Sequence, residues 1–131
     1  MEKAKILIVE DEVIIAMEIK NRLQNLGYEV TSVVDTSEDA IEKSEADKPD
    51  LIIMDIRING EMDGIDTAEI IRNKFGIPVV FSTAYLDQER IERAKITMPF
   101  GYVLKPIQER DLKVTIEMAF YVAKVDAERR K

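Results

Sequence analysis

The chain has 131 residues, of which 19 are Lys or Arg and 26 are Asp or Glu, giving a formal net charge of −7. It contains no His and no Cys, which excludes imidazole and thiolate metal sites, Ser-His-Asp triads and a histidine general base. The negative charge disfavours direct binding to nucleic acid, and the absence of a long apolar run or signal-peptide core predicts a cytoplasmic protein without membrane contact.

Five short apolar runs alternate with segments in which apolar residues have helical spacing. The runs, which we expect to be strands, are residues 6–9, 28–34, 51–54, 79–81 and 102–104. The first, third and fourth are continuously apolar, as is typical of strands covered on both faces. Thr36 or Ser37 can begin the second helix, Asp63 the third, and Gly76 can end the third. This order predicts an α/β fold of the flavodoxin-like, doubly wound (βα)5 type, a five-stranded parallel sheet with helices on both faces.

Polar side chains follow four of the predicted strands, at the edge where open parallel sheets bind ligands. Glu10 and Asp11 follow the first strand, Asp55 the third, Thr83 the fourth and Lys105 the fifth. Each alone has an ordinary explanation, such as helix capping or a surface charge. Together they form a complete set, because carboxylates suit Mg²⁺ whereas a hydroxyl and an ammonium suit phosphoryl oxygens.

The chain resembles response-regulator receiver domains of two-component signalling over residues 4 to about 122. The matching segments are Ile-Leu-Ile-Val-Glu-Asp-Glu at 6–12, Leu-Ile-Ile-Met-Asp at 51–55, Met-Asp-Gly at 62–64, Ser-Thr-Ala at 82–84 and Gly-Tyr-Val-Leu-Lys-Pro at 101–106. The resemblance implies that Asp55 accepts a phosphoryl group from a phosphohistidine of a histidine kinase or phosphotransfer protein. Such a domain is a switch and not a conventional enzyme, although it catalyses its own phosphorylation and dephosphorylation.

The resemblance also implies a magnesium site. Asp11 and Asp55 would bind Mg²⁺ directly, Glu10 would act through water, and the backbone carbonyl of Arg57 would complete the protein ligands. The bond between Lys105 and Pro106 is expected to be cis, as in the family.

The remaining implied roles concern the phosphoryl group. Thr83 and Lys105 would hold its oxygens, and the rotamer of Tyr102 would change with the position of the Thr83 hydroxyl. Arg57 and Tyr85 lie two residues beyond the acceptor and beyond Thr83, where we expect them to flank the path of the attacking water. Both are large, and neither suits the orienting of that water, so we expect slow self-dephosphorylation.

Two alternative functions use the same residues. A magnesium-dependent hydrolase of the haloacid-dehalogenase type also has an Asp nucleophile, but it needs a second Asp where this chain has Arg57. A pseudo-receiver that only binds partners would not need all four site groups. Activity on small phosphate esters and a phosphorylation test distinguish these alternatives.

The last predicted helix starts near Gln108 and runs into the charged tail. Its first part belongs to a receiver domain at residues 1–122, and residues 123–131 form its C-terminal extension. One apolar stripe suits the sheet and comprises Leu112, Ile116, Ala119 and Ala123. A second comprises Val114, Met118, Tyr121 or Val122, and Val125. It is either part of a wide buried face or a seam for another helix, in a homodimer or a coiled connector to an output domain. The fourth helix, fifth strand and last helix would then form the output surface, with charges at Arg90, Arg93, Lys113, Glu117 and Lys124 around the seam.

Overall fold

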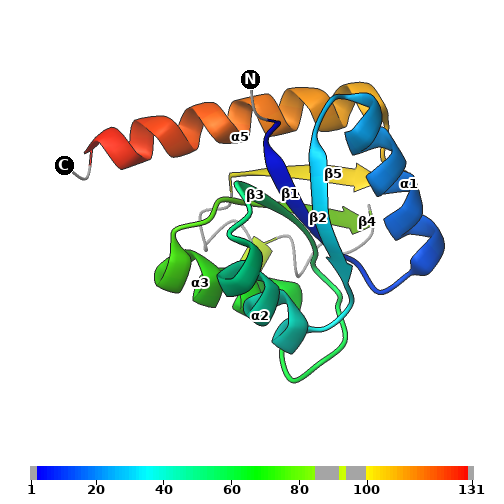
Figure 1. Ribbon diagram of the computed structural model, residues 1–131. Coiled ribbons are helices and arrows are strands. Elements are labelled where there is room, and N and C mark those ends of the chain that lie inside the picture. The colour runs from blue at the N-terminus through cyan, green and yellow to red at the C-terminus, as the bar shows by residue number, and fades with distance from the viewer. Residues whose placement is uncertain (1–2, 85–91, 94–99, 130–131) are drawn as a thin grey trace.

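The computed structural model describes residues 3–84, 92–93 and 100–129, and it contains one parallel sheet with the strand order β2-β1-β3-β4-β5 (Figure 1). The strands are β1 Lys5–Val9, β2 Glu29–Val34, β3 Leu51–Asp55, β4 Val79–Ala84 and β5 Gly101–Lys105. The helices are α1 Val13–Asn25, α2 Ser37–Asp47, α3 Gly64–Phe75 and α5 Glu109–Arg129. The predicted doubly wound architecture is confirmed for the described residues. Of the fourth predicted helix only residues 92–93 are described, and these two are helical.

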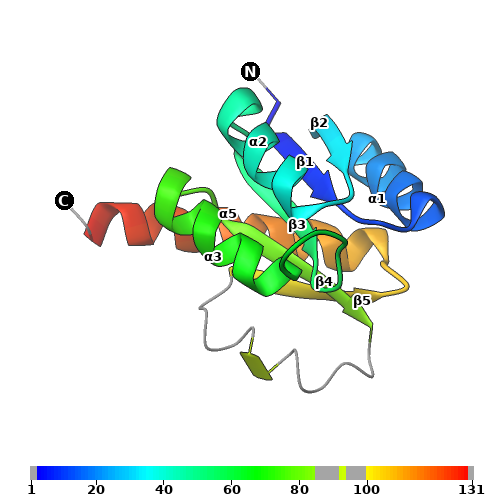
Figure 2. The ribbon, with the colours of Figure 1, turned by 90° about the horizontal axis from the view of Figure 1, so that it is seen from below.

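Helices cover both faces of the sheet, with α1 and α5 on one side and α2 and α3 on the other (Figures 1 and 2). Alternation along a strand divides the side chains between the two layers. Ile6 and Ile8 pack toward α1 and α5, whereas Leu7 and Val9 pack toward α2 and α3. All four are fully buried, which explains why the sequence of β1 is continuously apolar.

The predicted helix boundaries at Thr36, Asp63 and Gly76 are also present. Thr36 Oγ1 accepts a hydrogen bond from the Asp39 amide at 3.1 Å and caps α2. Asp63 Oδ1 accepts one from the Asp66 amide at 3.0 Å and caps α3. Such caps contribute about 1 kcal/mol each. They fix where α2 and α3 begin, close to the carboxyl edge of the sheet.

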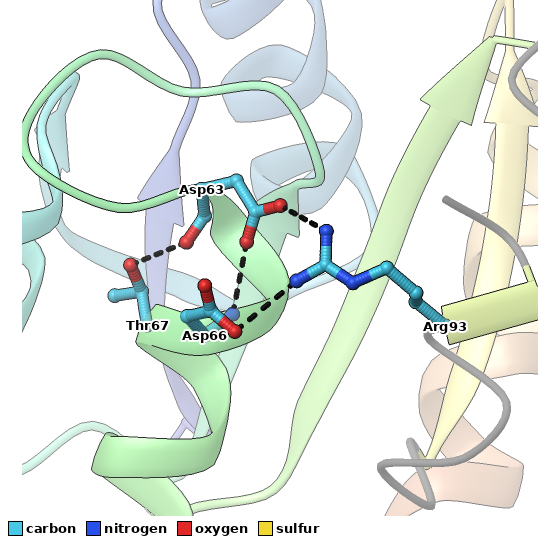
Figure 3. Close-up of polar contacts among 4 residues, drawn as sticks. All are labelled: Asp63, Asp66, Thr67 and Arg93. Atoms are coloured by element: carbon cyan, nitrogen blue, oxygen red, sulfur yellow. Dashed lines mark hydrogen bonds and ion pairs between the residues drawn. The ribbon is translucent and has the colours of Figure 1, made fainter. Parts of the chain in front are cut away.

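Asp63 also joins the start of α3 to residue 93 (Figure 3). Arg93 Nη1 lies 2.8 Å from Asp63 Oδ2, and Arg93 Nη2 lies 3.2 Å from Asp66 Oδ1. These contacts raise the pKa of the Arg93 guanidinium, first through its hydrogen bond to Asp63. Thr67 Oγ1 donates to the Asp63 carbonyl at 2.7 Å. Arg93 therefore lies at the beginning of α3 and not at the seam on α5, where the sequence led us to place it.

The last helix, α5, continues past the edge of the sheet in both views (Figures 1 and 2). Leu112, Ile116 and Ala119 are buried against the sheet as predicted, and Ala123 is half-buried. The second stripe is not part of a wide buried face. Its exposed side chains are Val114 at 55%, Met118 at 57%, Tyr121 at 65% and Val122 at 44%. Among the described residues, no helix combines the length and apolar character that crossing a bilayer requires.

Candidate functional site

The carboxyl ends of β1, β3, β4 and β5 surround a pocket of about 480 Å³. Its lining residues are Asp11, Glu12, Ile15, Asp55, Arg57, Thr83, Ala84 and Lys105. Glu10 is buried beside the pocket and contacts Lys105. The structure thus brings together Glu10, Asp11, Asp55, Thr83 and Lys105, as the sequence predicts. Tyr85 lies outside the described residues.

Asp55 is held at the end of β3 by the backbone that follows it. The Arg57 amide donates to Asp55 Oδ1 at 3.1 Å. The Gly64 amide donates to the Ile56 carbonyl at 2.8 Å, which brings the start of α3 against β3. A Cβ atom on Gly64 would overlap the backbone oxygen of Asp55, so only glycine allows this approach. Asp55 is 5% exposed and lines the pocket.

Lys105 is an internal counter-ion for two carboxylates. Its Nζ lies 2.7 Å from Glu10 Oε1 and 2.9 Å from Asp55 Oδ2. The bond between Lys105 and Pro106 is cis, as expected. Burial alone would lower the pKa of Lys105, but its hydrogen bonds to Glu10 and Asp55 outweigh that effect and raise it. The ammonium therefore stays charged between two acids.

The surroundings of Glu10 raise its pKa. Burial, followed by the hydrogen bond it shares with Asp55, raises the pKa of Glu10 to about 7 although Lys105 opposes the change. The Glu12 amide donates to Glu10 Oε2 at 3.2 Å. One ammonium does not fully neutralise two neighbouring carboxylates, so the site favours a further cation.

The acidic side chains have the composition and spacing of a site for a hard cation. One carboxylate oxygen from each of Glu10, Asp11 and Asp55 lies within 4.8 Å of the other two. All three ligands are oxygens, which Mg²⁺ prefers, and the only side chain of this set that is more than slightly exposed is Asp11. The residues fit a magnesium ion that enters from the pocket.

Thr83 and Tyr102 lie on the same face of the sheet. Phe81 and Thr83 are two residues apart on β4, so their side chains lie on the same face. Tyr102 of β5 pairs with Phe81 of β4, and the two ring centroids are 6.3 Å apart. Thr83 is 2% exposed, and its hydroxyl donates to the Ala84 carbonyl at 3.3 Å. The Tyr102 hydroxyl is buried and has no hydrogen-bond partner in the part of the chain that the structure describes. Burial, and then the charge of Glu92, raises the pKa of Tyr102.

An exposed apolar surface lies beside this pocket and was not predicted from the sequence. Its side chains are Val13, Ile14 and Met17 of α1 and Val33 of β2, with exposed fractions from 42% to 76%. A second pocket of about 500 Å³ is lined by residues of α1 and β2 and by Glu10 and Asp11. The sequence does contain an indication of this surface. Residues 13–17 are all apolar, and a helix with one buried face leaves some of five consecutive side chains exposed.

Comparison with protein families and curated proteins gives consistent matches. The family model of the response regulator receiver domain matches residues 6–117. The chain is 37% identical to the transcriptional regulatory protein PdtaR of Mycobacterium tuberculosis over 115 residues, which are 88% of this chain and 56% of that protein. It is 33% identical to the phyllosphere-induced regulator PhyR of Methylorubrum extorquens over 118 residues, or 89% and 43% of the two chains. The chain thus spans about half the length of these relatives.

Solved structures match nearly the whole chain. The signal receiver domain of a modulated diguanylate cyclase from Desulfovibrio desulfuricans is 35% identical with a TM-score of 0.89, covering 95% of this chain and 99% of that one. The N-terminal domain of a response regulator/sensory box/GGDEF three-domain protein from Carboxydothermus hydrogenoformans is 39% identical with a TM-score of 0.84, covering 94% and 98%.

Proposed function

This chain belongs to the response regulator receiver domain family of two-component signalling, and we propose that its switch is the phosphorylation of Asp55 by a partner's phosphohistidine, with Mg²⁺ as cofactor. Receiver domains are regulatory and are not conventional enzymes. The observation that supports the proposal best is the position of Asp55. It is a buried carboxylate at the pocket, with one oxygen bound to a backbone amide and the other to the Lys105 ammonium.

The proposed step needs no general base, because the Asp55 carboxylate is itself the nucleophile. One carboxylate oxygen forms a bond to phosphorus, and the bond from phosphorus to the imidazole nitrogen of the donor breaks. The electron pair stays on that nitrogen, and the product on this chain is an acyl phosphate. Phosphoryl transfer depends chiefly on positioning and charge neutralisation. The Arg57 amide and Lys105 orient the carboxylate, and Lys105 is placed to hold an oxygen of the transferred group.

The magnesium site belongs to the same proposal. Glu10, Asp11 and Asp55 would hold Mg²⁺, with Glu10 acting through water and the Arg57 carbonyl as a further ligand. When bound, the ion supplies positive charge that stabilises the phosphoryl oxygens during transfer. The support for this assignment is the set of three carboxylates within 4.8 Å of one another.

We further propose that Thr83 and Tyr102 carry the signal away from Asp55. A phosphoryl group adds charge and acceptor oxygens beside the pocket. The Thr83 hydroxyl, which donates to the neighbouring Ala84 carbonyl, can turn toward those oxygens. Such a turn vacates space on the face that Thr83 shares with Tyr102. The half-buried Tyr102 ring, whose hydroxyl has no hydrogen-bond partner among the described residues, can then move. The output would reach the surface formed by β5, α5 and the segment that includes residues 92–93.

The exposed apolar side chains of α1 are our candidate for the docking surface of the phosphodonor protein. Val13, Ile14 and Met17 border the pocket residues Asp11 and Glu12. Contiguous exposed apolar side chains typically mark interaction sites. A partner seated there would hold its phosphohistidine over Asp55, whereas a small phosphodonor would not need this surface.

Intact-mass measurement after incubation with acetyl phosphate tests the phosphorylation. The wild type with Mg²⁺ should gain one phosphoryl group, and it should gain none in EDTA. Asp55→Asn should remain unmodified, whereas the matched control Asp39→Asn on the exposed start of α2 should behave like the wild type. Phosphorylation of the Asp55→Asn variant would contradict the assignment. Sustained hydrolysis of small phosphate esters would favour a hydrolase, and a wild type that no donor modifies would favour a pseudo-receiver.

A further inference from the structure

Helix α5 has apolar side chains on two opposite faces, and only one of them is used by the fold. The inner face comprises Leu112, Ile116 and Ala119, which are buried against the sheet. The outer face comprises Val114, Met118, Tyr121 and Val125, which we call the α5 seam. Val114, Met118 and Tyr121 are each more than half exposed. Val125 is half-buried. Three exposed apolar side chains in line with it, on the far side of the helix from its own core, indicate a second contact.

The spacing of the α5 seam is that of a coiled coil. Its residues follow one another at intervals of four, three and four, which are the d and a positions of consecutive heptads. Ile116 and Ala123 then fall at f positions, on the side opposite the seam. The buried residues of α5 face the sheet, on the side of the helix opposite the seam. Because α5 also extends past the sheet (Figure 1), another helix can lie along the seam without meeting the sheet.

We propose that the α5 seam pairs with the same seam of a second copy of this chain, with the two helices antiparallel. Charge complementarity selects both the partner and the direction. Glu117 and Lys124 occupy successive g positions beside the seam, and both side chains are exposed without an ion pair among the described residues. In an antiparallel pair g faces g, so Glu117 meets Lys124 of the second copy, twice by symmetry.

A parallel pair would place different charges together. There g faces the following e position of the partner helix, which sets Lys124 against Arg129 of the second copy. Glu117 would face Val122 and gain no ion pair. The parallel arrangement thus has two like-charge contacts where the antiparallel one has two ion pairs.

The antiparallel pair aligns Val114 with Val125 of the second copy and Met118 with Tyr121. Only residues 114–125 take part, because Asp111 and Glu128 would meet beyond them and repel. This contact is smaller than standard specific interfaces, which bury about 1,200–2,000 Å². We therefore expect a weak, concentration-dependent dimer, which sedimentation equilibrium can measure on the unphosphorylated chain.

Charge reversal distinguishes the two directions. Glu117→Lys and Lys124→Glu should each raise the dimer dissociation constant, by roughly tenfold for two ion pairs converted to like-charge contacts. The double variant should return it to near the wild-type value. A parallel dimer would respond differently, because Lys124→Glu would then create an ion pair with Arg129 and tighten the dimer. Glu42→Lys on the exposed face of α2 makes the same change in net charge as Glu117→Lys and should have no effect.

Single cysteines give an independent test, since the chain has none of its own. Val114→Cys mixed with Val125→Cys should form a mixed disulfide under oxidation. Val125→Cys alone should not, because the two copies of residue 125 would lie about 16 Å apart along the antiparallel axis. Efficient disulfide formation by Val125→Cys alone would overturn the antiparallel direction. A wild type that stays monomeric at about 1 mM, like Met118→Glu, would overturn the interface itself.

Discussion

Glu10 provides the sharpest test of the electrostatics of the site, because its charge can be removed with little change in shape. Glu10→Gln replaces one carboxylate oxygen by an amide at a fully buried position that contacts Lys105. In the metal-free wild type the pKa of Glu10 is raised from 4.5 to about 7, mainly by burial. The folded state therefore holds this proton more tightly than the unfolded state does.

The raised pKa of Glu10 determines how the free energy of unfolding changes with pH. A raised pKa stabilises the folded state while the group is protonated, below its unfolded value of 4.5, and the stabilisation is lost as the pH rises through about 7. Without metal, Glu10 should reduce the free energy of unfolding of the wild type by about 2 to 3 kcal/mol between about pH 5 and pH 8. Glu10→Gln cannot ionise at this position. Between about pH 5 and pH 8 its free energy of unfolding should therefore decrease less than that of the wild type, and the difference should equal the contribution of Glu10.

Urea unfolding followed by circular dichroism in EDTA, at several pH values, measures the difference directly. Glu12→Gln is a matched control, because Glu12 is exposed at the same strand end and should leave the pH dependence unchanged. Added Mg²⁺ should stabilise the wild type by about 2.7 kcal/mol at 100 times its dissociation constant, and Glu10→Gln less at the same concentration. Parallel pH profiles for the wild type and Glu10→Gln in EDTA would refute the reasoning.

Two further predictions concern the donor and the lifetime of the acyl phosphate. Ile14→Asp places a charge on the exposed apolar surface of α1, and it should slow phosphorylation by the cognate phosphohistidine protein at least tenfold while the rate with acetyl phosphate stays within twofold. Equal slowing with both donors would place Ile14 in the site itself and not at a docking surface. Arg57→Ala should accelerate loss of the phosphoryl group several-fold if the large side chain restricts the attacking water. An unchanged hydrolysis rate, measured by phosphate release, would show that Arg57 does not shield the bond.

The sequence predicted the members of the site because each lies at a strand end, where local pattern and position in the fold coincide. Asp55 follows a fully apolar strand, and Lys105 precedes a proline at the end of another, so parallel strands bring them to one edge. The ion pairs of Lys105 with Glu10 and Asp55 could not be predicted in this way, because β5 neighbours neither β1 nor β3 and each contact depends on how far the side chains reach across the intervening strands.

Whether a side chain is exposed was harder to predict than whether its residue belongs to a helix or a strand. The periodicity of α5 permits Val114 and Met118 to be buried or exposed, and the choice depends on whether another layer lies outside the helix. Arg93 shows the same limit. Its charge fitted a surface near α5, but its ion pairs with Asp63 and Asp66 place it at α3, more than 25 residues away in sequence. Contacts of this kind follow from the path of the whole chain and not from a local pattern.

The position of Lys105 has a further consequence for how the domain depends on its surroundings. An ammonium that already occupies the space between Glu10 and Asp55 competes with any metal ion for the same negative charge. We therefore expect Lys105 to lower the affinity of the proposed site for Mg²⁺, because the ion meets carboxylates whose charge is already partly neutralised. A weaker site would fill and empty within the range of the free magnesium concentration, so that concentration would set the fraction of molecules with the ion bound.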